Sequence, residues 1–253
     1  MSLLKRLFGG SKPSATRHTV FDAPIAPDLP FFAIGDLHGC FDQMQSLLDQ
    51  VKDKDNTAPV VFVGDYIDRG ERSADVLRAL FDLRDDPQFI CLTGNHEDMM
   101  LAFLDQPQKG ERWLRFGGMQ TLASFGVGGV SMASKGEALT TAATKLAEAM
   151  GDEMIDWLRG LPTTWQSGNV TVVHAGADPH TPIMLQAAKT LAWGHPDFET
   201  IHREDGIWVV HGHTIVETAY ATDGRIAVDT GAYATGQLTA AYISDTDVQF
   251  LHT

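Results

Sequence analysis

The sequence is poor in cysteine, in basic residues and in long apolar runs. Its two cysteines, Cys40 and Cys91, are too few for a disulfide scaffold and favour a reducing compartment such as the cytoplasm. No run of about 18 apolar residues occurs, so we expect no transmembrane helix. The 19 Lys and Arg against 33 Asp and Glu give a formal net charge of −14. This balance excludes broad binding to nucleic-acid backbones, but it leaves room for a small anionic substrate at a local positive site.

The N-terminal region also lacks the marks of a secretion signal. Residues 1–10 are basic and have neither an apolar core of about 7–15 residues nor a small-residue cleavage site. Residues 9–30 contain Gly, Ser and four prolines, a composition typical of an extended chain. We therefore expect a flexible leader over residues 1–30 and one folded domain over residues 31–253.

Apolar runs that end in Gly-Asp or Gly-Asn recur along the chain. Residues 31–34, 60–63 and 89–92 show no polar alternation, which is typical of strands buried on both faces. A helical pattern follows each run, and the distance from Asp36 to Asp65 suits a strand–helix–strand unit. The pattern predicts an α/β fold with layered sheets.

The stretch from residue 110 to 160 departs from this alternation. Its helical pattern is broken by a Gly- and Ser-rich loop at 126–136, after which an Ala- and Thr-rich helix is expected over 137–150. We interpret the stretch as a helical insertion over one edge of the sheet. Shorter strands follow it, and Asp223-Gly224 is typical of a hairpin. The expected architecture is two facing sheets with helices outside.

Residues that can coordinate metals follow the buried strands, where α/β proteins place their sites. Their carboxylate, carboxamide and imidazole groups suit Mn²⁺, Fe²⁺ or Zn²⁺, and no cysteine pair has ligand spacing. A single Asp or Asn at such a place is better explained as a helix N-cap, but a set spread over five strand ends favours one shared centre. The metal-competent residues at these strand ends are Asp36 and His38, Asp65 and Asp68, Asn95, His96 and Glu97, His174, and His211 and His213.

Three motifs stand at the strand ends: GDLHG over 35–39, GDYIDRG over 64–70 and GNHE over 94–97. Together they resemble the signatures of the phosphoprotein phosphatase family of calcineurin-like metallophosphoesterases. About a dozen fixed letters in the family's order are far more specific than a lone glycine motif. HAG at 174–176 and GHT at 212–214 extend the resemblance. The stretch WLRFGGMQTLASFG, which starts at Trp113, is similar to the bacterial branch.

This resemblance implies a four-layer α/β/β/α sandwich and two divalent metal ions, most commonly Mn²⁺, with iron, Zn²⁺ or Ni²⁺ as alternatives. It also implies that a metal-bridging hydroxide attacks phosphorus directly, without a covalent phosphoenzyme. The implied ligand sets share Asp65 and are Asp36, His38 and Asp65 for one ion, and Asp65, Asn95, His174 and His213 for the other.

The same resemblance implies roles for neighbouring residues. Arg69 would bind the phosphate oxygens with its planar guanidinium, beside Asn95. His96 would protonate the leaving oxygen, while Asp68 would orient the imidazole and stabilise its charged form. Glu97 is better interpreted as a brace of its loop.

One position departs from the family pattern. Relatives usually carry a second phosphate-binding arginine where this sequence has His195. An imidazole would bind the phosphate less firmly, which would weaken binding or alter the substrate. Alternatively, Arg115 or Arg203 would supply the missing contact.

These features predict a metal-dependent phosphatase that acts on phosphomonoesters, with phosphoserine and phosphothreonine in proteins as the first candidates. The alternative is hydrolysis of dinucleoside polyphosphates of the diadenosine tetraphosphate type, or of capped RNA ends. A metal-binding regulatory protein without catalysis is a third hypothesis, which the complete set of candidate catalytic residues disfavours. The oligomeric state does not follow from the residues.

Overall fold

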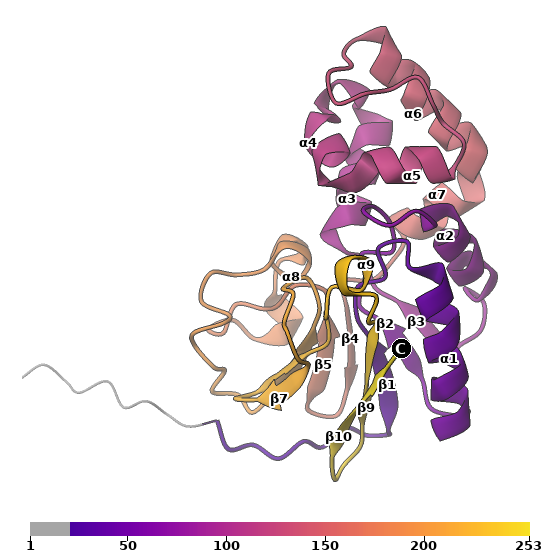
Figure 1. Ribbon diagram of the computed structural model, residues 1–253. Helices are drawn as coiled ribbons and strands as arrows, with labels where there is room; N and C mark the ends of the chain where they lie inside the picture. Colours follow the sequence, from indigo (N-terminus) through magenta and orange to yellow (C-terminus); the bar gives the residue numbers. More distant parts are fainter. Residues whose placement is uncertain (1–20) are drawn as a thin grey trace, which may run out of the picture.

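Two five-stranded sheets pack face to face in the computed structural model, which describes residues 21–253 (Figure 1). The first sheet has the order β10–β9–β1–β2–β3, with β1 (Phe31–Ile34), β2 (Val60–Phe62), β3 (Phe89–Cys91), β9 (Thr239–Ile243) and β10 (Val248–His252). The second has the order β4–β5–β6–β8–β7, with β4 (Thr164–Ser167), β5 (Val170–Val173), β6 (Trp208–His211), β7 (Tyr220–Thr222) and β8 (Arg225–Ala227). Most of the predicted leader, residues 1–20, lies outside the described residues.

Both sheets have parallel strands at their centres and antiparallel strands at one or both edges. In the first sheet β1, β2 and β3 run parallel, and β9 pairs antiparallel with the other side of β1. In the second sheet β5, β6 and β8 run parallel, while β4 and β7 add antiparallel edges. The loops that follow the parallel strands of each sheet therefore gather at one edge of that sheet.

The alternation of side chains along β1 explains its continuous apolar sequence. Phe31 and Ala33 point into the core between the two sheets, while Phe32 and Ile34 point toward the helices. All four side chains are fully buried, as the absence of polar alternation predicts.

Helices cover the outer face of each sheet and complete the predicted four layers. On α1 (Phe41–Lys54), Met44, Leu47 and Val51 are buried at helical spacing against the first sheet. The other helices of this layer are α2 (Ser73–Asp82) and α3 (Asn95–Asp105). On the second sheet, the side chain of Leu191 in α8 (Ala188–Trp193) belongs to a smaller core with Val173 and Val209.

The stretch predicted as a helical insertion is helical and packs on α2 and α3 (Figure 1). It consists of η1 (Pro107–Lys109), α4 (Glu111–Trp113), η2 (Leu114–Gly118), α5 (Met119–Ser124), α6 (Glu137–Met150) and α7 (Asp152–Arg159). The short turns η3 (Ile183–Leu185) and α9 (Ala232–Thr235) lie outside it. Within residues 21–253, no helix combines the length and the apolarity needed to cross a bilayer.

The last ten residues of the predicted leader are hydrogen bonded to the second sheet. The Ala26 N–H donates to Asn169 Oδ1 at 2.7 Å, and the indole N–H of Trp208 donates to the Ala23 carbonyl at 3.0 Å. The Phe21 ring packs edge-on against Trp208 with the ring centroids 5.1 Å apart. The packed chain thus reaches back to Phe21 rather than starting at Phe31.

Candidate metal centre

The six predicted metal ligands come together where strands of both sheets end. Asp36 follows β1, Asp65 follows β2, and Asn95 begins α3 after β3. His174 follows β5 and His213 follows β6, so the second sheet supplies the remaining imidazoles. The centre therefore forms only when the two sheets have packed against each other.

The backbone at these loops is strained. Five of the six non-glycine residues with positive φ in residues 21–253 belong to the site, and they are His38, Asp65, Asp68, Arg69 and His213. A left-handed conformation costs a residue with a side chain about 1 kcal/mol or more, and such strain gathers where function requires it.

Asp65 lies between two groups of donor atoms. His38, Asp65 and His96 form one group, and Asp65, His174 and His213 form the other; within each group the atoms lie within 4.8 Å of one another. The Asp65 Oδ2 atom is 3.6 Å from His38 Nε2, while its Oδ1 atom is 3.3 Å from His174 Nε2. The two oxygens thus face different imidazoles, as a carboxylate between two ions requires.

Asp36 and Asn95 complete the cluster on its two sides. Asp36 Oδ2 lies 4.0 Å from His38 Nε2, and both carboxylate oxygens of Asp36 accept from the His213 N–H at 3.1 Å. On the other side, Asn95 Oδ1 is 3.0 Å from His174 Nε2.

The imidazoles are held in orientations that suit ligands. His38 Nδ1 is 2.7 Å from the Ile67 carbonyl and His174 Nδ1 is 3.2 Å from the Val63 carbonyl, which turns each Nε2 atom toward the cluster. The buried Nε2 atom of His38 has no hydrogen-bond partner. Burial lowers the pKa of His38 to about 3 and that of His213 to about 4, so both rings are neutral and free to donate a lone pair.

The cluster buries several carboxyl groups close together, away from water. The buried carboxyl groups are Asp36, Asp65, Asp68, Glu97 and Asp229. Burial, and next the charge of Asp229, raise the pKa of Asp36 well above its usual range. Burial alone would lower the pKa of His174, but the charges of Asp65 and Asp36 outweigh it and raise that pKa to about 10. Divalent cations would replace such a proton, so charge, donor type and the unpartnered Nε2 atom all fit metal ions.

His96 lies beside this cluster and is held by Asp68. Its Nδ1 atom is 2.6 Å from Asp68 Oδ2, and its Nε2 atom is 3.2 Å from the Arg69 guanidinium. Burial by itself would lower the pKa of His96, but the charge of Asp65 and the bond to Asp68 outweigh it and raise the pKa. The imidazole thus lies between the Asp68 carboxylate on one side and the Arg69 guanidinium on the other.

The insertion supplies two further donors to Asp68. The Trp113 indole N–H donates to Asp68 Oδ2 at 2.9 Å, and the Thr121 hydroxyl donates to Oδ1 at 2.6 Å. Neither role follows from the sequence, where Trp113 fits an ordinary apolar helix stripe. The insertion thus helps to position the group that orients His96.

Glu97 braces the loop that carries Asp65, as the sequence predicts. Its Oε2 atom accepts from the N–H groups of Asp65 and Gly94 at 2.9 and 3.0 Å, and its Oε1 atom accepts from Tyr66 at 2.9 Å. Burial, and next the charge of Asp65, raise the pKa of Glu97 to about 7. A Cβ atom at Gly94 would lie 2.2 Å from Asp65 Oδ1, so this close approach requires glycine.

Arg69 lies between the cluster and a groove of about 570 Å³, which it helps to line. Its guanidinium lies over the ring of Tyr233, 4.9 Å from the centroid, a contact that the sequence does not reveal. Gly117 touches the Arg69 backbone, where a Cβ atom would come within 2.4 Å of the Arg69 nitrogen. The groove is lined by Arg69, Leu114, Arg115, Phe116, Gly117, Met119, Gln120, Met132 and Tyr233.

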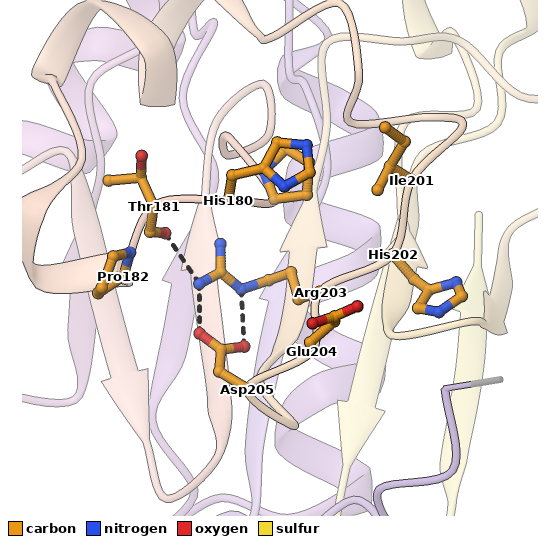
Figure 2. Close-up of a pocket in the computed structure, with 9 residues that line it drawn as sticks. His180, Thr181, Pro182, Ile201, His202, Arg203, Glu204 and Asp205 are labelled. Atoms are coloured by element: carbon orange, nitrogen blue, oxygen red, sulfur yellow. Dashed lines mark hydrogen bonds and ion pairs between the residues drawn. The ribbon is translucent and has the colours of Figure 1, made fainter. Parts of the chain in front are cut away.

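Arg115 and Arg203, the two candidates for the missing phosphate contact, lie in different pockets. Arg115 lines the groove and forms an ion pair with Glu111 at 2.5 Å. Arg203 cannot take this role, because it is held in a separate pocket of about 400 Å³ that contains no cluster residue (Figure 2). Its guanidinium donates to the carbonyls of Asp178 and Thr181 at 2.9 and 3.0 Å and is paired with Asp205.

Two other histidines lie apart from the donor groups. The His195 Nδ1 atom accepts from the Asp197 N–H at 3.3 Å, and a role for His195 in substrate binding stays a prediction. The ring of His211 packs edge-on against Phe198, and burial lowers the pKa of His211 to about 4. His213, and not His211, therefore lies in a donor group with Asp65 and His174.

Comparison with known proteins agrees with this geometry. The family model described as calcineurin-like phosphoesterase matches residues 29–217. A solved structure described as a proposed diadenosine tetraphosphatase superposes with a TM-score of 0.63 at 20% identity, covering 91% of this chain and 98% of that one. At this identity the likeness concerns the fold.

Two curated relatives carry related names. A symmetrical bis(5'-nucleosyl)-tetraphosphatase of Actinobacillus succinogenes is 31% identical over 58% of this chain and 44% of its own length. The chain thus spans about half the length of the symmetrical enzymes that it matches. The asymmetrical bis(5'-nucleosyl)-tetraphosphatase PrpE of Bacillus velezensis is 28% identical over 81% of this chain and 86% of its own length.

Proposed function

Because the chain belongs to the calcineurin-like phosphoesterase family of metal-dependent hydrolases, we propose that it hydrolyses phosphoric anhydrides and esters at the cluster centred on Asp65. The observation that carries the proposal is the arrangement of two donor groups around one carboxylate, next to Arg69 and His96. Two divalent ions held there would supply Lewis acidity and an activated water. Carboxylate, carboxamide and imidazole donors make Mn²⁺, iron or Zn²⁺ the proposed metals.

The neighbouring residues supply binding and proton transfer. Arg69 binds the non-bridging oxygens of the phosphoryl group, and its stack on Tyr233 holds the guanidinium in place. His96 gives its proton to the leaving oxygen, and Asp68 keeps the imidazole oriented and charged. Asn95, at the edge of the same cluster, is the proposed neighbour of the bound phosphate.

Dinucleoside polyphosphates of the diadenosine tetraphosphate type are our first substrate proposal. The motifs alone favour phosphoserine and phosphothreonine, but the names of the curated relatives support the nucleotide alternative better. Phosphoproteins stay the second candidate because the three motifs resemble those of the phosphoprotein phosphatases. Capped RNA ends rank lower, since the net charge of −14 disfavours an extended nucleic-acid surface.

One comparison of substrates tests this proposal. The purified protein with Mn²⁺ is assayed on diadenosine tetraphosphate, a panel of phosphoserine and phosphothreonine peptides, and p-nitrophenyl phosphate, with Asp65→Asn as the inactive control. We expect the highest kcat/KM on diadenosine tetraphosphate, and its products, two ADP or ATP with AMP, identify the bond that breaks. A preference for phosphopeptides would replace the first candidate with the second. Inactivity on every substrate would overturn the hydrolase proposal.

A further inference from the structure

Two partly exposed aromatic rings flank the reactive pair of Arg69 and His96. Phe116 is 48% exposed, and its ring is nearly perpendicular to that of His96 with 6.5 Å between the centroids. Tyr233 is 39% exposed and lies beneath the Arg69 guanidinium. Both rings line the groove that starts at Arg69, so apolar flat surface is open to a ligand next to the chemistry.

The two rings lie on different sides of the proposed position of the phosphate, next to different residues. Tyr233 contacts the phosphate-binding group and also the His38 ring, 5.5 Å away, so it belongs to the metal side. Phe116 contacts His96, the group that faces the leaving oxygen. A leaving group that departs past His96 therefore enters the part of the groove formed by the insertion.

Phe116 is held in place from outside the groove. The Arg112 guanidinium lies 5.7 Å from the Phe116 centroid and 4.5 Å from that of Trp193. The Trp193 indole N–H in turn donates to Asp98 Oδ2 at 3.0 Å. Asp98 of α3 and Trp193 of α8 thus fix the part of the insertion that carries Phe116. A ring that is already fixed lowers the entropy cost of stacking a ligand on it.

The rest of this groove suits a nucleotide more than an aliphatic or acidic side chain. Exposed Gln120 offers both donor and acceptor atoms to a base edge, and Arg115, which is paired with Glu111, has further guanidinium N–H groups to offer to phosphates. Met132, 48% exposed, is a polarizable surface that accommodates a flat ring.

From these contacts we infer that Phe116 is a stacking platform for the nucleobase of the leaving nucleotide, and that the insertion thereby determines specificity. The inference rests on the proposed function and deepens it, because it assigns the leaving half of a dinucleoside polyphosphate to one named surface. Aromatic side chains stack on any base, so the platform selects for the presence of a base rather than for its identity.

The test compares two anhydrides that differ only in their nucleosides. The ratio of kcat/KM for diadenosine tetraphosphate to that for inorganic tetraphosphate is measured for the wild type, Phe116→Leu and Phe116→Tyr. We expect Phe116→Leu to lower this ratio about tenfold, since stacking of one base is lost, and Phe116→Tyr to restore it. Leu29→Ala is the control, because Leu29 is 43% exposed and precedes β1 at the end of the sheet opposite the site.

The outcomes separate this inference from the proposed function. A wild type that turns over diadenosine tetraphosphate, with a ratio that Phe116→Leu leaves unchanged, would overturn the platform and keep the substrate class. A wild type that hydrolyses inorganic tetraphosphate but not the dinucleotide would overturn both. Full retention of the ratio in Phe116→Leu together with a loss in Leu29→Ala would show that the base binds elsewhere.

Discussion

His96 Nδ1 lies 2.6 Å from Asp68 Oδ2, and both side chains are closed to solvent. The other bonds to the Asp68 carboxylate come from Trp113 and Thr121 of the insertion. The proposed proton donor is therefore positioned by a chain of contacts that starts in the insertion and ends at the metal cluster.

Replacement of His96 by alanine should slow the substrates with the poorest leaving groups most. We expect kcat on phosphoserine peptides to fall by about 10²- to 10⁴-fold, because the serine alkoxide needs a proton as it departs. p-Nitrophenyl phosphate and diadenosine tetraphosphate release more stable anions and should lose much less. Steady-state kinetics on the three substrates measures this difference, and equal losses on all of them would exclude general acid catalysis by His96.

Replacement of Asp65 by asparagine should remove bound metal as well as activity. Asp65 faces both donor groups, so a neutral amide weakens the sites for both ions together. We expect the metal content, measured by elemental analysis after gel filtration, to fall from two ions per chain to less than one. Asp42→Asn is the matched control because the Asp42 side chain is 75% exposed. Unchanged metal content in Asp65→Asn would contradict the shared site.

Gly117 should tolerate no side chain because it combines a φ of 117° with contact to the Arg69 backbone. We expect Gly117→Ala to cost about 1–2 kcal/mol of unfolding free energy from the backbone alone, and more from the clash. Two other glycines separate the cost of the backbone conformation from the cost of the clash. Gly126 has a φ of 75° with open space around it, and Gly128 has open space without positive φ. Denaturant unfolding should rank the losses Gly117→Ala, then Gly126→Ala, then Gly128→Ala, and only the first should also lower kcat.

Asp55, which follows α1, should make stability depend on pH. Its carboxylate accepts from the Thr57 N–H at 3.0 Å and the Thr57 hydroxyl at 2.8 Å, and these bonds lower the pKa of Asp55 below its usual 3.8. Because the folded-state pKa is depressed, the stabilisation is complete above the unfolded pKa and is lost as the pH falls through the folded value.

We therefore expect Asp55→Ala to destabilise the fold by about 1 kcal/mol at pH 7, and by less near pH 3, where part of the stabilisation is already lost. Denaturant unfolding at the two pH values measures both losses. Asp53→Ala is the control, because Asp53 is exposed in the last turn of α1. A loss that stays constant between the two pH values would contradict the role of the ionised Asp55.

Clear apolar runs and helical spacing predict much of the fold. The first three strands, the insertion and the helix over residues 137–150 follow from these patterns, although β3 is only partly buried. The edge strand β4 escapes prediction, and β7 is indicated only by the Asp223-Gly224 hairpin signal that joins it to β8. Thr164–Ser167 alternates little and Tyr220–Thr222 is largely exposed, so neither carries the apolar signal of a central strand.

The residues of the candidate metal centre could be predicted from the sequence, whereas the side chains that surround them could not. The ligands of the centre follow strand ends, a place that can be found from the sequence alone. Tyr233, Trp113 and Thr121 reach the site through the packing of distant segments, which periodicity and local motifs do not encode. The ion pair of Arg203 with Asp205 is local instead, and it depends on the path of their own loop.

The strand order of the first sheet has a consequence for biosynthesis. Phe31 of β1 pairs with Ile243 of β9, so the sheet is completed by strands that leave the ribosome after the entire second sheet. Until then one edge of β1 is an unpaired template for other chains. His174 and His213 of the second sheet also emerge late, so the donor group that they form with Asp65 is complete only after most of the chain has been made. A nascent chain stalled before β9 would leave this edge open to pairing with other chains.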